Sequence, residues 1–305
     1  MIRLPSFAKI NLCLELLGER PDGYTEIRTI FQSLRLADEM TFERAPAGVL
    51  EVSCDDPDVP SGEENLVWQS ARLLMEGHSP SPPAGARIAI RKKIPAGAGL
   101  GGGSSNAAVA LVVLARLWKM NLPAGRLLDL AARVGSDVPF FLHGGTALGL
   151  GRGDEVYPLP DIDETDVLIA VPPFRIRTAE TYSRARMRLT ARSGGHTIRR
   201  FALRSLPGET GYSYVINELE PAASQERDML PALRRRLVEL GAEAAALCGS
   251  GSAVFGLFPD GSPGCGRLEE ARGLLSREFP GLRTLRSRTL RAADYYEALY
   301  ESAGV

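Results

Sequence analysis

The chain has 305 residues, of which 44% are hydrophobic and 24% are charged, and its formal net charge is -1. These values are typical of a globular protein with one large or two ordinary domains, and a nearly neutral chain has no global attraction to nucleic acid or to an anionic membrane. The four cysteines are irregularly spaced, and we see neither a signal-peptide pattern nor a transmembrane stretch, so we expect a cytoplasmic protein without a disulfide framework.

Strand patterns dominate the first hundred residues. Apolar residues alternate in residues 8–18 and 25–36, and turn-forming residues 20–24 between them indicate a hairpin. Two further strands are predicted at residues 49–54 and 86–95.

Helical spacing of apolar residues appears in three segments. Residues 65–77 and 124–135 each predict an amphipathic helix that ends in glycine, and residues 104–120 are apolar almost all round, which predicts a buried helix. The proline-rich residues 79–86 predict a surface loop, whereas residues 136–160 predict a turn followed by one or two strands.

The second half of the chain alternates between strands and helices. We predict strands at residues 166–173, 253–258 and 281–290, helices at 225–242 and 266–280, and a glycine-rich turn at 248–252. The whole pattern is α+β with antiparallel-looking sheets in two domains, which we place at residues 1–160 and 161–305.

Residues 94–108, IPAGAGLGGGSSNAA, form the most informative segment. Backbone N–H groups of a glycine-rich turn, together with the free N–H groups and positive dipole end of the helix that follows, make a binding site for an anion, most often a phosphate. Ser104 and Ser105 suit a helix cap, and they could also donate to phosphate or bind a metal ion.

Three other interpretations compete with a phosphate cradle. A P-loop is absent because no lysine precedes the serines, and a dinucleotide fingerprint formally fits Gly97, Gly99 and Gly102 but lacks an acidic residue about twenty positions on. A purely structural loop is the third. The all-apolar helix that follows favours phosphate binding.

The same segment resembles the phosphate-binding motif of the GHMP kinases, the small-molecule kinases that include galactokinase, homoserine kinase and mevalonate kinase. The triple glycine followed by SSNAA is most similar to the members that act on a cytidine diphosphate-linked methylerythritol. Residues 8–34, 135–155, 217–223 and 247–258 resemble further signatures of these members, in the same order.

The resemblance implies a function and a fold. The reaction would be ATP-dependent phosphorylation of the 2-hydroxyl group of that substrate, in the non-mevalonate pathway to isoprenoid precursors. The first domain would resemble the second domain of ribosomal protein S5, the second would be ferredoxin-like, and ATP and substrate would lie in the cleft between them.

The resemblance also implies two catalytic residues. Asp137 would be the base that accepts the hydroxyl proton, although residue type alone favours a cap of the turn before Pro139. Lys9 would be the charged partner of Asp137, and it would orient the hydroxyl or stabilise the transferred phosphoryl group. Without the resemblance, Lys9 would be interpreted as a solvent-exposed residue on a strand.

Substrate contacts would come from several segments. Asn11 lies two residues after Lys9 on one strand face and would contact the substrate. Tyr24 would lie against the cytosine ring, followed by Thr25 where the family usually has histidine, which leaves the strength of cytosine recognition open. Thr178 and Tyr182 would border the substrate.

ATP would be held by the two glycine-rich segments, and Mg²⁺ would accompany it. The ATP-binding residues implied by the resemblance are Pro95, Ala96, Gly97, Ala98, Gly99, Leu100, Gly101, Gly102, Gly103, Ser104, Ser105, Asn106, Gly249, Ser250 and Gly251. Ser105 is the candidate metal ligand, because the sequence offers no acidic pair that can be assigned to the ion.

Other functions stay open at this point. The chain could be another GHMP kinase or a catalytically silent relative that senses a ligand. We expect only small-molecule partners, with neither nucleic acid nor a membrane, and a monomer or a homodimer.

Overall fold

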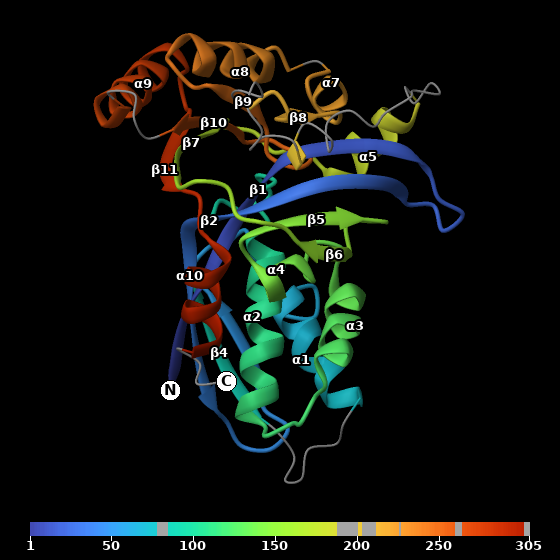
Figure 1. The fold of residues 1–305 in the computed structure, drawn as a ribbon. Coiled ribbons are helices and arrows are strands. Elements are labelled where there is room, and N and C mark those ends of the chain that lie inside the picture. The colour runs from blue at the N-terminus through green and yellow to red at the C-terminus, as the bar shows by residue number, and fades with distance from the viewer. Residues whose placement is uncertain (78–84, 188–200, 203–211, 226, 260–263, 302–305) are drawn as a thin grey trace.

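Two long strands form the centre of the molecule. In the computed structural model, which describes residues 1–77, 85–187, 201–202, 212–225, 227–259 and 264–301, β1 (Ile2–Glu19) pairs antiparallel with β2 (Thr25–Arg44). Irregularities in the register at three places, the first between Phe7 and Ala8, accompany the curve of this pair from the lower to the upper half of Figure 1. The predicted hairpin is confirmed, and both strands are longer than predicted.

The strand pair belongs to a seven-stranded sheet with the order β3-β4-β2-β1-β8, in which β5 and β6 extend beside β2. The added strands are β3 (Leu50–Cys54), β4 (Ala86–Arg91), β5 (Thr146–Leu150), β6 (Glu155–Pro158) and β8 (Ile216–Asn217). The expectation of antiparallel pairing is wrong at two places, because β3 pairs parallel with β4 and β1 pairs parallel with β8. A helix or a long chain segment separates the partners in each case, which is the connection that parallel pairing requires.

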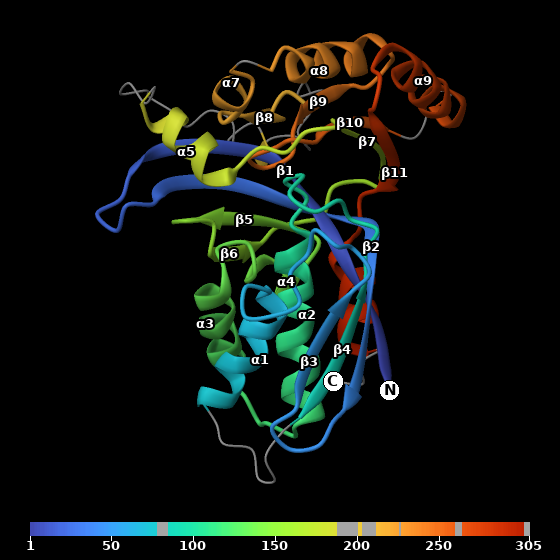
Figure 2. The same cartoon turned by 180° about the vertical axis from the view of Figure 1, so that it is seen from behind.

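Helices cover one face of this sheet, as Figures 1 and 2 show from opposite sides. They are α1 (Leu66–Gly77), α2 (Gly102–Leu117), α3 (Ala124–Val134) and the single-turn α4 (Phe140–His143). The first three confirm the predicted helices, whereas α4 lies where we predicted only a turn before the strands.

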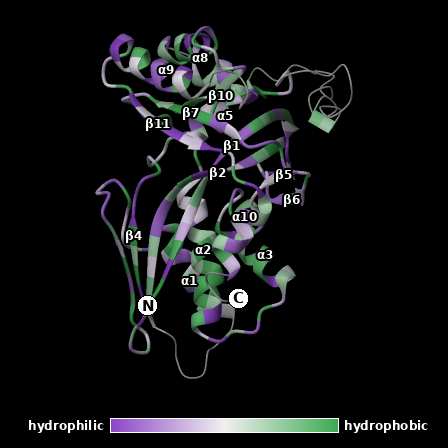
Figure 3. Ribbon diagram, turned by 60° about the vertical axis from the view of Figure 1, so that its left-hand side comes forward, coloured by the Kyte–Doolittle hydropathy of each residue, from purple (hydrophilic) through white to green (hydrophobic). Residues whose placement is uncertain are grey.

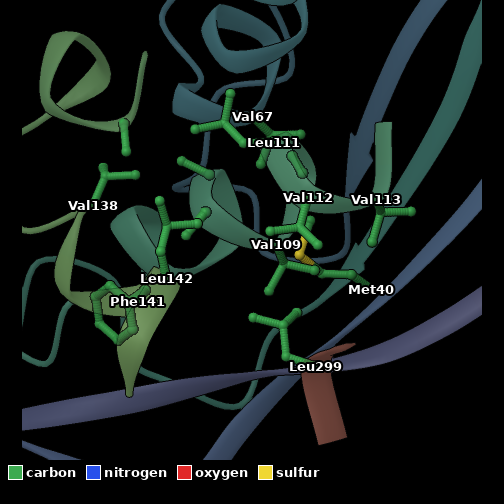
Figure 4. Close-up of a cluster of buried hydrophobic side chains, with 14 of the residues drawn as sticks. Met40, Val67, Val109, Leu111, Val112, Val113, Val138, Phe141, Leu142 and Leu299 are labelled. Atoms are coloured by element: carbon green, nitrogen blue, oxygen red, sulfur yellow. The ribbon is translucent and has the colours of Figure 1, made fainter. Parts of the chain in front are cut away.

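Helix α2 is the centre of the larger core. Every residue from 105 to 115 is buried, as expected for a helix that is apolar all round. Figure 4 shows its Val109, Leu111 and Val112 among side chains that come from β2, α1, α4 and the C-terminal segment. This rigid helix carries the glycine-rich segment at its N-terminus.

A second sheet has four antiparallel strands in the order β11-β7-β10-β9. Its strands are β7 (Thr165–Val171), β9 (Ala244–Leu247), β10 (Val254–Pro259) and β11 (Arg283–Arg288), and its main helices are α8 (Met229–Glu239) and α9 (Gly264–Glu278). With α5 (Thr178–Arg186) and α8 after the first strand and α9 before the last, this is the strand–helix–strand pattern of a ferredoxin-like domain. The ribbon in Figure 3 contrasts the mostly hydrophobic residues of α2 with the mixture of hydrophilic and hydrophobic residues along α9.

The division into residues 1–160 and 161–305 stays a proposal. The C-terminal α10 (Ala292–Tyr296) and the π-helix η1 (Glu297–Glu301) return to the first part, where the Tyr295 hydroxyl donates to the Phe141 carbonyl at 2.6 Å.

Helices α5 and α7 (Glu220–Ala223) were not predicted. Residues 79–84 of the predicted proline-rich loop lie outside the described residues. Among the described helices, none is long and apolar enough to cross a membrane.

Candidate active site

A cavity of about 900 Å³ lies between the two parts of the molecule. Its walls come from β1, β2, the glycine-rich segment before α2, the turn before α4, the start of α5 and the turn after β9. Because each of these elements is anchored in one of the two cores, the cavity is built on a rigid frame.

Strand β1 presents two different faces to its surroundings. Ala8, Ile10 and Leu12 pack in the hydrophobic cluster shared with the second sheet, whereas Lys9 and Asn11 line the cavity. This follows from the alternation of side chains along a strand. The sequence prediction that Lys9 and Asn11 share one face is therefore confirmed.

Lys9 and Asp137 form an ion pair at the centre of the cavity. The Lys9 Nζ atom lies 3.1 Å from Oδ2 of Asp137, which follows α3 in the turn 136–139. The lysine side chain is 4% exposed and the aspartate side chain is 33% exposed, so the carboxylate is the member that a ligand can reach. Asp137 faces Lys9 rather than capping α4, whose N-cap position is Pro139.

The ammonium group of Lys9 is held in place by two further groups. Its Nζ donates to Oδ1 of Asn11 at 2.8 Å and lies 5.3 Å from the ring centre of Phe31. Asn11 in turn donates to the Thr29 hydroxyl at 2.7 Å, which donates to the Cys13 carbonyl at 2.6 Å. This chain of bonds restricts Lys9 to one position beside Asp137.

The glycine-rich segment adopts the backbone that its sequence predicts. Gly97, Gly99 and Gly101 all have φ between 70° and 80°, in the left-handed region that favours glycine. The backbone N–H of Lys9 donates to the Leu100 carbonyl at 3.0 Å, which fastens the segment directly to β1.

A second glycine-rich turn, residues 248–252, packs against the first one. The Ala253 N–H donates to the Ala98 carbonyl at 3.1 Å, and Gly249 lies beside Lys9. Asn217 holds this turn, since its Nδ2 donates to the carbonyls of Leu247 at 2.9 Å and Gly249 at 2.7 Å. The two turns and Lys9 thus form one connected wall of the cavity.

Aromatic and basic side chains gather at the hairpin end of the cavity. The Arg152 guanidinium lies 4.9 Å from the ring centre of Tyr24, and Arg186 of α5 donates to the Gly23 carbonyl at 2.6 Å. The buried Thr25 hydroxyl has no hydrogen-bond partner among the described residues. A polar group of a ligand that reached it would satisfy this hydroxyl.

Tyr182 and Cys248 stay protonated in this setting. Burial raises the pKa of the Tyr182 phenol, and the Asp137 carboxylate raises it further. Burial likewise raises the pKa of the Cys248 thiol to about 12, and the nearby Lys9 acts in the opposite direction. Neither group can serve as an anionic base or nucleophile near neutral pH.

The structure brings nearly all predicted site residues to this one cavity. Lys9, Asp137, Asn11, Tyr24, Thr25, Thr178, Tyr182, residues 95–104, Asn106, Gly249 and Ser250 all line it. Ser105 and Gly251 are not among its lining residues. Ser105 is fully buried, and its hydroxyl accepts a hydrogen bond from Ser6 at 2.7 Å, so its placement does not support the metal-ligand assignment.

Sequence reasoning missed several lining residues. They are Asp58, Asn65, Phe31, Lys92, Arg152 and Arg186, together with the backbone around them. Only Lys92 carried a usable signal, because it is one of four lysines in a chain whose other basic residues are arginines. The others lie in loops, in strand β2 or at the end of helix α5, and their arrangement around the cavity depends on the folded chain.

Metal binding by a cluster of side chains finds no support here. Among the described residues, no group of three or more His, Cys, Asp and Glu is placed to hold a metal ion. Ser104 does line the cavity at the start of α2, beside the predicted phosphate site. This donor set fits an ion carried mainly by phosphate oxygens and water.

Comparison with known proteins agrees with the geometry. Residues 65–145 match the family described as the GHMP kinases N terminal domain, and residues 204–264 match the GHMP kinases C terminal family. The chain is 42% identical over 265 residues to a 4-diphosphocytidyl-2-C-methyl-D-erythritol kinase of Solibacter usitatus, a match that covers 84% of this chain and 81% of the relative.

Solved structures give the same result. A crystal structure of 4-(cytidine 5'-diphospho)-2C-methyl-D-erythritol kinase matches with a TM-score of 0.76 and 31% identity, and the match covers 94% of this chain and 99% of the other. A homoserine kinase from Cytophaga hutchinsonii matches with a TM-score of 0.71 and 19% identity over 96% of each chain, which shows a shared fold alone.

Proposed function

This chain belongs to the family of 4-diphosphocytidyl-2-C-methyl-D-erythritol kinases, within the GHMP kinases, and from this premise we propose how its residues carry out the reaction. It is an ATP-dependent small-molecule kinase of the isoprenoid precursor pathway. The acceptor in our proposal is the 2-hydroxyl group of 4-diphosphocytidyl-2-C-methyl-D-erythritol. The observation that carries the proposal is the Lys9–Asp137 pair, which lies in the same cavity as the glycine-rich segment and the aromatic hairpin end.

Asp137 is the proposed proton acceptor. As the 2-hydroxyl oxygen forms its bond to the γ-phosphorus, the bond from that phosphorus to the bridging oxygen of ATP breaks, and ADP leaves with the electron pair. The hydroxyl proton passes to the Asp137 carboxylate, which is accessible from the cavity. The transfer therefore needs no other base.

Lys9 would supply positive charge close to the negatively charged phosphoryl group during its transfer. Its ammonium group is nearly fully buried, and its bonds to Asn11 and Asp137 fix its position. Fixed charge in a water-poor site stabilises a transferring phosphoryl group without reorganisation during the reaction. Lys9 also keeps the Asp137 carboxylate oriented toward the hydroxyl.

The two glycine-rich turns would hold the phosphates of ATP. Their left-handed glycines allow the backbone to approach a phosphate closely, and the N-terminus of α2 favours negative charge. Bound Mg²⁺ would neutralise phosphate charge, with Ser104 as the protein group that is best placed to reach it. The remaining ligands in this proposal are phosphate oxygens and water.

The hairpin end would receive the cytidine group. Tyr24 and Tyr182 offer aromatic faces, and Arg152 and Arg186 offer positive charge for the diphosphate. The Thr25 hydroxyl, which has no partner among the described residues, would hydrogen-bond the base. Thr178, whose hydroxyl is 2.8 Å from that of Ser250, would border the reacting sugar alcohol.

We place the enzyme in the cytoplasm because Cys13, Cys54 and Cys248 are free thiols in the described structure, which suits a reducing compartment.

A substrate panel tests the function. ADP release is measured with Mg-ATP and, in turn, the cytidine substrate, its uridine analogue, mevalonate and homoserine. We expect turnover with the cytidine compound. Turnover with mevalonate or homoserine instead would identify a different GHMP kinase, and ATP binding without any turnover would identify a ligand sensor.

Substitution of Asp137 tests the mechanism. Asp137→Asn should lower kcat by about 10²- to 10⁴-fold, because the proton acceptor is lost, while the affinity for ATP stays close to that of the parent. Asp129→Asn, at an exposed position on α3, is the control and should leave kcat unchanged. Unchanged turnover in Asp137→Asn would show that the assigned base is wrong.

A further inference from the structure

The carboxylate of Asp38 on β2 is fully buried and accepts four hydrogen bonds. Oδ1 accepts from the backbone N–H groups of Lys93 and Ile94, both at 2.8 Å. Oδ2 accepts from Nδ2 of Asn106 at 3.1 Å and forms an ion pair with the Lys92 ammonium group. Every acceptor position of this carboxylate is therefore used.

These donors mark the two ends of the glycine-rich segment. Lys92, Lys93 and Ile94 come directly before Pro95, and Asn106 lies in the first turns of α2. One carboxylate thus joins the point where the chain leaves β4 to the point where it enters α2. The segment between them is rich in left-handed glycines, which impose little shape of their own.

Ser6 strengthens the same connection. It lies opposite Asp38 in the β1–β2 register, accepts from Nδ2 of Asn106 at 2.8 Å and donates to the Ser105 hydroxyl at 2.7 Å. The start of α2 is therefore bonded to both central strands. This also explains why the Ser105 hydroxyl points into the protein instead of toward the cavity.

The charge of Asp38 is balanced by Lys92. An uncompensated carboxylate near the start of α2 would oppose the positive potential that attracts phosphate. Lys92 lines the cavity, and a Cβ atom added to Gly102 would lie 3.0 Å from its Nζ, so the compensating charge stands beside the helix N-terminus. The ion pair keeps this end of the helix favourable for an anion.

We propose that Asp38 is a positioning residue for nucleotide binding, which acts by holding both ends of the glycine-rich segment at the spacing that the phosphates of ATP require. The proposal rests on the assignment of this segment as the ATP-binding loop. Asp38 touches neither ATP nor the reacting atoms, because it does not line the cavity.

The test compares Asp38→Asn with a matched buried aspartate. The amide of Asp38→Asn keeps one acceptor oxygen and loses the charge, so KM for ATP and the Kd of ATP measured by calorimetry should rise at least about tenfold. KM for the cytidine substrate should stay within about twofold. The control is Asp166→Asn, a buried carboxylate paired with Arg286 in the second sheet, which should lower the Tm and leave ATP affinity unchanged.

A double variant separates a loss of ATP affinity from a loss of folding stability. Asp38→Asn combined with Lys92→Met removes both buried charges, so it should recover Tm. ATP binding should stay at least about tenfold weaker, because the tie between the loop ends is incomplete and the positive charge of Lys92 beside the cavity is also lost. ATP affinity in Asp38→Asn within about twofold of the Asp166→Asn control would overturn the proposal, as would an equal rise of both KM values.

Failure of the proposed function and failure of the role of Asp38 would give different results. A parent protein that binds ATP but phosphorylates none of the tested alcohols would contradict the proposed function, and the Kd values for ATP would still decide the role of Asp38.

Discussion

Replacement of Gly99 by alanine should separate the two glycine-rich turns. Gly99 has a φ of +80°, and a Cβ atom at this position would lie 1.8 Å from the carbonyl oxygen of Cys248 and 2.8 Å from its carbon. Both are backbone atoms, so no side-chain rotation can relieve the collision. The two turns must move apart.

The size of this displacement follows from the contact distance. Real Cβ contacts essentially never fall below 3.0 Å, so the turns must separate by about 1.2 Å, the difference between 3.0 and 1.8 Å. The left-handed backbone adds about 1–2 kcal/mol of strain. A shift of about 1 Å at a reacting centre can lower the rate about 10²-fold. We therefore expect Gly99→Ala to lose about 10²-fold in kcat/KM for ATP.

Gly97→Ala is the matched control. Gly97 has a φ of +70°, but a Cβ atom there would meet only the Arg175 side chain, at 3.5 Å or more, so this variant carries the same strain without the collision. We expect it to lose about 1–2 kcal/mol of stability and only a few-fold in kcat/KM. Coupled ADP release and thermal unfolding measure both variants. Equal losses of kcat/KM in the two variants would refute the steric argument.

Three further outcomes are expected. Asn217→Ala leaves two buried carbonyls without a donor and should cost about 2 kcal/mol in denaturant unfolding together with a fall in kcat; an unchanged kcat would contradict its role in holding Gly249. Thr25→His should lower KM for the cytidine substrate several-fold and leave KM for ATP unchanged, and a higher KM for the cytidine substrate would mean that the threonine hydroxyl serves the base better than an imidazole does. Burial lowers the pKa of His143 below the ordinary histidine value of 6.5, so the folded protein resists protonation of this side chain. Its contribution to stability is therefore complete above pH 6.5 and is lost as the pH falls below that value. Tm measured from about pH 7.5 to 5 should fall less steeply in His143→Gln than in the parent.

Local sequence rules predicted the features that depend on near neighbours. The period of two along β1 placed Lys9 and Asn11 on one face, and the apolar periodicity of residues 104–120 predicted the buried helix α2. Gly97, Gly99 and Gly101 could be predicted as special backbone positions, because only glycine adopts left-handed φ values without strain. These features make up the frame of the site.

Features that depend on distant segments escaped prediction. Asp38 meets Lys92 across 54 positions and Asn106 across 68, so no spacing rule connects them. Ser105 was the candidate metal ligand because the sequence offers no acidic pair for the ion. Neighbouring residues on a helix point in directions about 100° apart, and here Ser104 lines the cavity whereas Ser105 is buried in the protein. The short helices α4 and α5 carry too few residues to show a period.

Gly101 explains how the proposed phosphate site and the proposed catalytic pair fit each other. A Cβ atom there would lie 2.7 Å from the ring of Phe141 and 2.9 Å from Cγ of Lys9. The glycine therefore allows the loop to touch α4, which follows Asp137, and β1, which carries Lys9. Since the loop backbone also accepts the Lys9 N–H through Leu100, any movement of the phosphate loop moves the lysine with it. In the proposed mechanism, the separation between bound phosphate, Asp137 and Lys9 would thus be set by one packed junction, which is the positioning that phosphoryl transfer requires.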